Sequence, residues 1–157
     1  MSKYTATRGR LSRGTFPLLA LYNFRPPRQF RLDFHESVTT SSGHRDADLA
    51  RSAAALCVDN KADDVVLLDL HGITDMTDYF VLASGTSDTH VRSVAQHVMD
   101  GLARRGIRVH SVEGLAKGRW VLLDYVDFVV HVFHPSLRAF YQLERLWGDA
   151  PALAVSP

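Results

Sequence analysis

Ser84 and Gly85 are the first residues whose types and position could do chemistry. They lie between an apolar run and a helical pattern, where nucleotidyltransferases have a Gly-Ser turn whose backbone amides hold a triphosphate. That chemistry also needs paired carboxylates on the following strand, because two metal ions must be held there. The strand predicted next, residues 107–112, contains no acid. We therefore expect a plain strand-to-helix connection, and nucleotidyl or phosphoryl transfer is kept only as the alternative function.

Two carboxylates and two histidines lie close together in the second half of the chain. Asp124 and Asp127 are followed by His131 and His134, and both residue types bind zinc. The two histidines have odd spacing, so a regular strand points them to opposite faces. Cys57 is the single cysteine and permits neither an internal disulfide nor a thiolate metal site. With no other catalytic pattern in the chain, the sequence predicts no catalytic residue, no metal and no cofactor.

Residues 120–135 are expected to form a β-hairpin that positions these side chains. Two runs of apolar, β-branched and aromatic residues flank the segment from Asp124 to Asp127, which is the pattern of two strands joined by a turn. If the loop consists of Tyr125 and Val126, the spacing fixes the cross-strand neighbours. The expected pairs are Asp124 with Asp127, Leu122 with Val129, and Trp120 with His131.

Side chains alternate along a strand, so the hairpin has two different faces. One face is wholly apolar and is predicted to be core: Val121, Leu123, Phe128, Val130 and Val132. The other face adds a histidine and two carboxylates to its apolar residues: Trp120, Leu122, Val129, His131, Asp124 and Asp127. This mixed face is either a half-covered docking surface or a surface that a helix covers, with Trp120 as ordinary core. The sequence leaves both interpretations open.

The rest of the chain predicts an α/β domain. From residue 46 onward, apolar residues recur with helical and strand periods in turn. The predicted order is a helix (46–60), two strands (64–70 and 78–83), a helix (88–105), a strand (107–112), the two hairpin strands and a last helix (136–147). This order implies a single domain with a five-stranded mixed sheet flanked by helices. No apolar run is long enough to span a membrane.

Charge divides the chain into two parts. Residues 1–32 carry seven Lys or Arg and no acid, which leaves 11 basic and 17 acidic residues in 33–157 and a net charge of −6 there. Binding nucleic acid requires a basic face, so an acidic domain argues against wrapping nucleic acid directly. Complementary potential instead favours a basic protein as the partner.

Residues 1–45 show no lasting period and are expected to lie outside the fold. This basic extension has three interpretations: an organellar transit peptide, a disordered tail near RNA, or sequence translated upstream of the true start. The domain is predicted to span residues 46–151, with a tail at 152–157.

Several motifs in one order resemble the ribosomal silencing factor family, also called Iojap-like. The motifs are Leu67-Leu68-Asp69-Leu70, the segments 77–87 and 120–135, Glu113-Gly114, and Phe140-Tyr141-Gln142-Leu143-Glu144-Arg145-Leu146-Trp147-Gly148-Asp149-Ala150-Pro151. The resemblance implies a nucleotidyltransferase-like topology without the catalytic carboxylates, and no enzymatic activity. It also implies binding to the fourteenth protein of the large ribosomal subunit, which blocks joining of the small subunit and lowers translation when nutrients are short.

The resemblance has further implications for partners and location. Contact with ribosomal RNA is expected to be peripheral, the free chain a monomer or weak dimer, and no membrane is involved. Location is the bacterial cytoplasm, or a mitochondrion or plastid if residues 1–45 are a transit peptide. Organellar relatives are expected to assist assembly of the large subunit.

The mixed hairpin face is the predicted surface for the ribosomal protein. Its residues are Trp120, Leu122 and His131, with Asp124 and Asp127 at the edge and Asp78 and Tyr79 extending it. One residue departs from the family pattern: Val126 stands where the family usually has the glycine of a tight turn. A β-branched residue resists the positive φ of such a turn, so we expect either a wider loop or backbone strain.

Overall fold

The computed structural model describes residues 39–155, with side chains from residue 43 onward. Most of the predicted basic extension, residues 1–38, lies outside the described residues. The elements follow in the order α2 (Thr39–Asp59), β1 (Asp63–Asp69), β2 (Tyr79–Ser84), α3 (Asp88–Ala103), β3 (Ser111–Glu113), β4 (Trp120–Asp124), β5 (Phe128–Phe133), α4 (Pro135–Tyr141), α5 (Leu143–Leu146) and β6 (Ala152–Leu153).

The strands form one mixed sheet in the order β3-β4-β5-β2-β1-β6. β2 and β5 run parallel, and every other neighbouring pair is antiparallel. The prediction of a single α/β domain with a mixed sheet flanked by helices is confirmed. The sixth strand was missed because β6 pairs with β1 only at Leu67 and Leu68, and two residues are too few to show a period.

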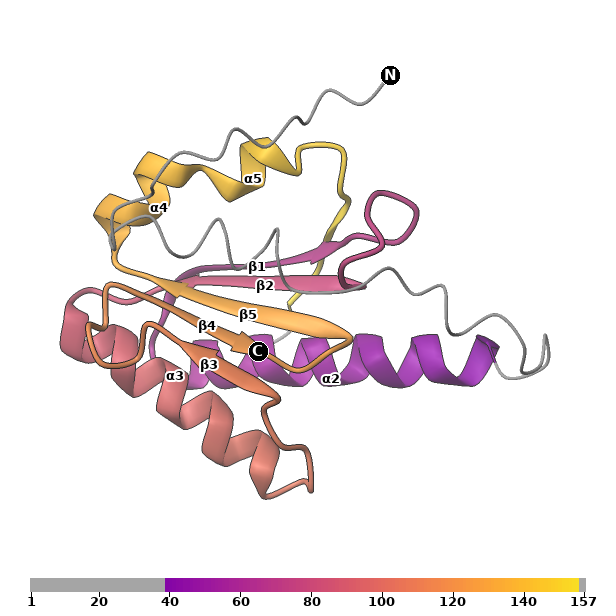
Figure 1. The fold of residues 1–157 in the computed structure, drawn as a ribbon, viewed down its shortest axis with the longest axis horizontal. Helices are drawn as coiled ribbons and strands as arrows, with labels where there is room; N and C mark the ends of the chain where they lie inside the picture. The colour runs from indigo at the N-terminus through magenta and orange to yellow at the C-terminus, as the bar shows by residue number, and fades with distance from the viewer. Residues whose placement is uncertain (1–38, 156–157) are drawn as a thin grey trace, which may run out of the picture.

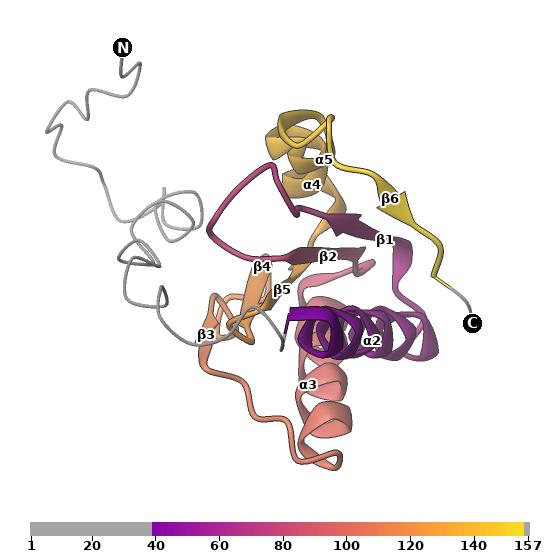
Figure 2. The same ribbon diagram turned by 90° about the vertical axis from the view of Figure 1, so that its right-hand side faces the viewer.

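Helices cover both faces of the sheet. α2 and α3 lie on one face, whereas α4 and α5 lie on the other (Figures 1 and 2). Strands β2, β4 and β5 are buried along their whole length, as expected of central strands. The five hairpin residues predicted to be core all pack with the α2 and α3 side, and Val130 is completely buried there. No helix in the described part of the chain is long and apolar enough to cross a bilayer.

Three element boundaries differ from the prediction. α2 begins at Thr39 rather than near residue 46, because Ser, Thr and Gly are weak helix formers and hide the start of the helix. In place of the predicted strand 107–112, β3 covers only Ser111–Glu113. The predicted last helix is broken at Gln142, whose left-handed φ of 47° separates α4 from α5.

The hairpin has a register that differs from the predicted one. Trp120 pairs with Phe133 instead of His131, Leu122 pairs with His131, and Asp124 pairs with Val129. The predicted pairs were wrong because four residues, 125–128, lie between Asp124 and its partner Val129, where the prediction had two. The register moves by two residues, so each side chain keeps its predicted face.

Candidate functional site

Three aspartates gather at one end of the sheet. The parallel pairing of β2 with β5 sets Tyr79 beside Phe128, so the residues just before them, Asp78 and Asp127, also lie side by side. The backbone N–H of Asp78 donates to the carbonyl of Asp127 over 2.9 Å. Asp46 of α2 completes the group, and carboxylate oxygens of the three residues lie within 4.8 Å of one another. We call these residues, together with Asp69, the acidic end.

Asp69 joins the acidic end through His71. His71 Nδ1 lies 2.6 Å from Asp69 Oδ1, and its Nε2 lies 3.8 Å from Asp78 Oδ1. The edge of the histidine ring packs on Tyr79, with 5.0 Å between the ring centroids. Burial raises the pKa of Tyr79, and the charges of Asp69 and Asp78 raise it further. The acidic end therefore has a negative potential that its neighbours experience.

The acidic end has the ligand type of a hard-cation site, since carboxylate oxygens bind Mg²⁺ and Ca²⁺. The side chains of Asp46, Asp78 and Asp127 are only half-buried, however, and clustered acids at this exposure are common without an ion. We assign no metal to the cluster. Carboxylates gathered at this exposure give the surface a negative potential, which attracts positive charge.

Asp124 lies in the hairpin but has a structural role. It is buried, with 4% of its surface exposed, and its Oδ1 accepts a hydrogen bond from the N–H of Val126 over 2.7 Å. Val126 has a φ of 78°, and the N–H of Asp127 donates across it to the carbonyl of Tyr125. The structure thus shows both a wider loop and a β-branched residue held at positive φ. The predicted position of Asp124 opposite Asp127 is wrong.

Trp120 and His131 lie deep in the mixed face. The indole N–H of Trp120 donates to His131 Nδ1 over 3.2 Å, and His131 has no exposed surface. Burial lowers the pKa of His131 to about 3, so the imidazole is neutral near pH 7. Tyr141 of α4 packs on Trp120, with 4.9 Å between ring centroids, while Trp147 packs on Phe80. Of the two interpretations that the sequence left open, the structure shows the second: a helix covers this face, and Trp120 belongs to the core.

Of the seven predicted binding residues, the structure leaves two partly exposed. Asp78 and Asp127 are half-buried and form part of the acidic end. The other five are buried: Tyr79, Trp120, Leu122, Asp124 and His131. Sequence patterns do not distinguish a mixed sheet face that meets solvent from one that a later helix covers.

His134 does not join His131, in agreement with the expected spacing. It lies after β5 and caps α4, since its Nδ1 accepts a hydrogen bond from the N–H of Ser136. The two histidines therefore serve separate structural roles.

The Ser84–Gly85 turn is explained by packing. A Cβ at Gly85 would lie 2.7 Å from the backbone nitrogen of Val91, so glycine is required where α3 begins. Ser87 caps α3 by accepting from the N–H of His90. The next strand, β3, ends on one acid, Glu113, whereas a two-metal site needs a pair.

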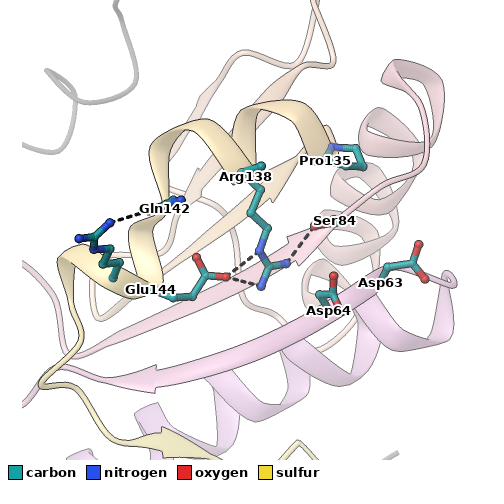
Figure 3. A pocket seen from close by; sticks show the side chains of 9 residues that line it. Asp63, Asp64, Ser84, Pro135, Arg138, Gln142 and Glu144 are labelled. Carbon is teal, nitrogen blue, oxygen red and sulfur yellow. Dashed lines mark hydrogen bonds and ion pairs between the residues drawn. The ribbon is translucent and has the colours of Figure 1, made fainter.

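A groove of about 730 Å³ lies between this turn, the start of β1 and the helices α4 and α5 (Figure 3). Arg138 spans it: the guanidinium donates to Ser84 Oγ over 2.9 Å and to Glu144 Oε1 over 2.7 Å and 2.5 Å. In one continuous helix over residues 136–147, Arg138 would lie on the solvent side, but only 12% of its side chain is exposed. The helix break at Gln142 brings Glu144 back toward it, and no helical spacing predicts that contact.

Comparison with known proteins identifies the family. Residues 43–157 match the sequence profile of a family described as "Ribosomal silencing factor during starvation". The chain belongs to the ribosomal silencing factor family. It is 46% identical over 103 residues to Ribosomal silencing factor RsfS of Bacillus subtilis, a match that covers 66% of this chain and 87% of that protein.

Solved structures of similar proteins agree with the fold. A crystal structure of protein CV0518 from Chromobacterium violaceum matches with a TM-score of 0.64 and 33% identity, over 70% of this chain and 92% of that one. A crystal structure of a Bacillus halodurans protein matches with a TM-score of 0.61 and 37% identity, over 69% and 98%. The described domain thus corresponds to nearly the full length of these two proteins.

Proposed function

We propose that this chain represses translation by binding the fourteenth protein of the large ribosomal subunit, so that the small subunit cannot join. The observation that carries the proposal is family membership: a relative named for ribosomal silencing is 46% identical and is matched over 87% of its length. The described domain is therefore the part that does the silencing. Regulation of translation on the ribosome, without an enzymatic reaction, is the function that follows.

The acidic end is the surface that fits such a partner. Ribosomal proteins are basic as a class, and a surface with Asp69, Asp78 and Asp127 at one end of the sheet offers complementary charge. The loop between β1 and β2 adds an apolar contact, because Ile73 in this loop is 38% exposed beside the acidic end. Apolar area supplies affinity, whereas the carboxylates orient the encounter.

The five buried residues of the predicted surface support the acidic end from beneath. Asp124 fixes the hairpin loop from which Asp127 projects, through its bond to Val126. Tyr79 carries the ring on which His71 packs. The remaining three fill the core that holds β4 and β5 in register: Trp120, Leu122 and His131. Substituting any of the five should alter binding by disturbing the fold, not by removing a direct contact with the partner.

Location and assembly follow from the ribosome as target. The chain acts where its ribosomes are: the bacterial cytoplasm, or a mitochondrion or plastid if residues 1–45 are a transit peptide. We propose that it is a monomer or weak dimer when free, and that it binds the large subunit during maturation as well as afterwards.

A subunit-joining experiment tests the function. Purified large and small subunits are mixed at a magnesium concentration that permits association, with and without the full chain, and whole ribosomes are separated on a sucrose gradient. The proposal predicts fewer whole ribosomes, with the chain sedimenting alongside the large subunit. Unchanged joining at saturating chain, or sedimentation with the small subunit, would contradict it.

A further inference from the structure

Basic residues are concentrated along one side of this acidic domain. Residues 101–119 contain five Lys or Arg and one acid, although 33–157 as a whole has a net charge of −6. The side lies around the end of α3, the strand β3 and the loop that follows it. With one more arginine from α3, six residues make up what we call the basic strip: Arg92, Arg104, Arg105, Arg108, Lys117 and Arg119.

The basic strip presents its charges to solvent. All six residues except Arg92, which is half-buried, are exposed. Among residues 43–155 none of them forms an ion pair, whereas Arg138 is paired with Glu144. Their hydrogen bonds go to uncharged groups: Arg105 donates to Ser52 Oγ over 2.7 Å, and Arg119 donates to Ser136 Oγ over 3.1 Å. Such cations can bind an anionic partner.

The fold spreads these charges along one flank of the molecule. Arg92, near the start of α3, donates to the carbonyl of Lys117 over 3.3 Å, which ties the loop after β3 to that end of the helix. Arg104, Arg105 and Arg108 follow the other end of the helix. Arg104 follows Arg92 by twelve positions along the helix, so the two groups lie roughly 18 Å apart. α3 lies on the opposite face of the sheet from α4 and α5, and β3 is the strand at one edge of the sheet (Figure 1).

The character of the strip indicates how a partner would be bound. The large apolar residues that are exposed in the described part of the chain are Ile73, Val112, Phe140 and Leu146, and only Val112 lies near the strip. Aromatic platforms, on which single-stranded bases stack, are therefore missing from this flank of the described domain. A row of cations without such platforms is suited to the phosphate backbone of a duplex, with little dependence on sequence.

We propose that the basic strip binds the phosphate backbone of double-stranded RNA. The choice of RNA rests on the proposed function, since a ribosome presents both basic proteins and RNA helices. The acidic end and the strip would then contact two different components of one ribonucleoprotein surface. The net negative charge of the domain does not reveal the basic strip, because the acidic and basic residues lie on different parts of the surface.

Binding to a 20-base-pair RNA duplex, measured by fluorescence anisotropy with the full chain, tests the proposal. The variant Arg104→Gln/Arg105→Gln/Arg108→Gln removes three charges from the strip. The control Arg51→Gln/Lys61→Gln/Arg145→Gln removes three exposed charges elsewhere, so that net charge and the N-terminal arginines are the same in both. At about 100 mM salt we expect the strip variant to bind about tenfold or more weakly than the wild type, and the control less than about threefold more weakly.

Salt dependence gives a second readout. Removing phosphate contacts should reduce the slope of log affinity against log salt by about one for each phosphate no longer bound, in the strip variant only. If the strip variant unfolds, Lys117→Gln/Arg119→Gln at the other end of α3 replaces it, with a smaller expected decrease in affinity.

Two outcomes would overturn the proposal: equal decreases in affinity for the strip and control variants, or tighter binding of a single strand than of the duplex. Binding of the isolated ribosomal protein should not change in the strip variant. Failure of the RNA proposal is therefore distinguishable from failure of the proposed function.

Discussion

Trp120 donates its indole N–H to His131 Nδ1 across 3.2 Å, and both side chains lie beneath α4 and α5. The bond connects β4 to β5 within the face that sequence patterns left open between docking surface and core. Burial lowers the pKa of His131 to about 3, so the imidazole is neutral near pH 7 and its Nδ1 can accept this bond.

His131 should make the stability of the domain depend on pH. Its folded pKa is about 3, below the ordinary value of 6.5, so protonation favours the unfolded state. The contribution of the neutral imidazole to the free energy of unfolding is fully present above pH 6.5. It decreases as the pH falls toward the folded pKa, by up to about 1.4 kcal/mol per pH unit. Urea denaturation at about pH 7.5, 6 and 5 should show a steeper decrease in the wild type than in His131→Gln, which keeps an acceptor for Trp120. Parallel pH profiles would mean that another group is responsible.

Val126 should be a position where glycine stabilises the protein. A φ of 78° costs a β-branched residue about 1–3 kcal/mol in the folded state. Glycine removes this strain, but its greater freedom in the unfolded chain offsets part of the gain in stability. We expect Val126→Gly to raise the free energy of unfolding by about 1 kcal/mol, measured by urea denaturation. Val126→Ala is the control, because alanine keeps most of the strain. A destabilised glycine variant would show that the loop is not strained.

Much of the fold could be predicted from periodicity, and the exceptions have physical reasons. Val130 and its four neighbours on the apolar hairpin face were placed correctly because strand alternation survives a register change of two residues. The burial of Trp120 could not be predicted from the hairpin alone. It depends on the packing of α4 and α5, which a later segment of the chain forms. The burial of Tyr79, next to Asp78, was equally hidden from the local pattern.

Arg138 shows the limit of helical periodicity more sharply. A continuous helix would have pointed its side chain to solvent, but the left-handed Gln142 ends α4 and brings Glu144 to the guanidinium. Gln142 carries no signal of this conformation in its residue type, since glycine or asparagine is the usual choice at such a position.

Arg138→Gln should loosen α4 and α5 from the sheet. The variant removes the bonds to Ser84 and Glu144 and leaves a half-buried carboxylate without its cation. We expect it to lower the free energy of unfolding by about 1–3 kcal/mol. Arg145→Gln is the matched control, because Arg145 is exposed and makes only a 3.5 Å hydrogen bond to Gln142, and it should change stability by less than about 0.5 kcal/mol. Similar values for the two variants would show that Arg138 does not hold the helices.

The affinity of the acidic end for the large subunit is the measurement that tests the docking proposal most directly. Asp78→Asn/Asp127→Asn is compared with Asp63→Asn/Asp64→Asn, which removes two exposed charges at the far end of the sheet. Both variants are first checked for wild-type thermal stability, and binding to purified large subunits is then followed at two salt concentrations. The docking proposal predicts that the first pair of substitutions weakens binding about tenfold, mostly by slowing association and most strongly at low salt, while the second pair leaves it within about twofold. Wild-type binding by a stable Asp78→Asn/Asp127→Asn protein would contradict the assignment of the acidic end as the docking surface.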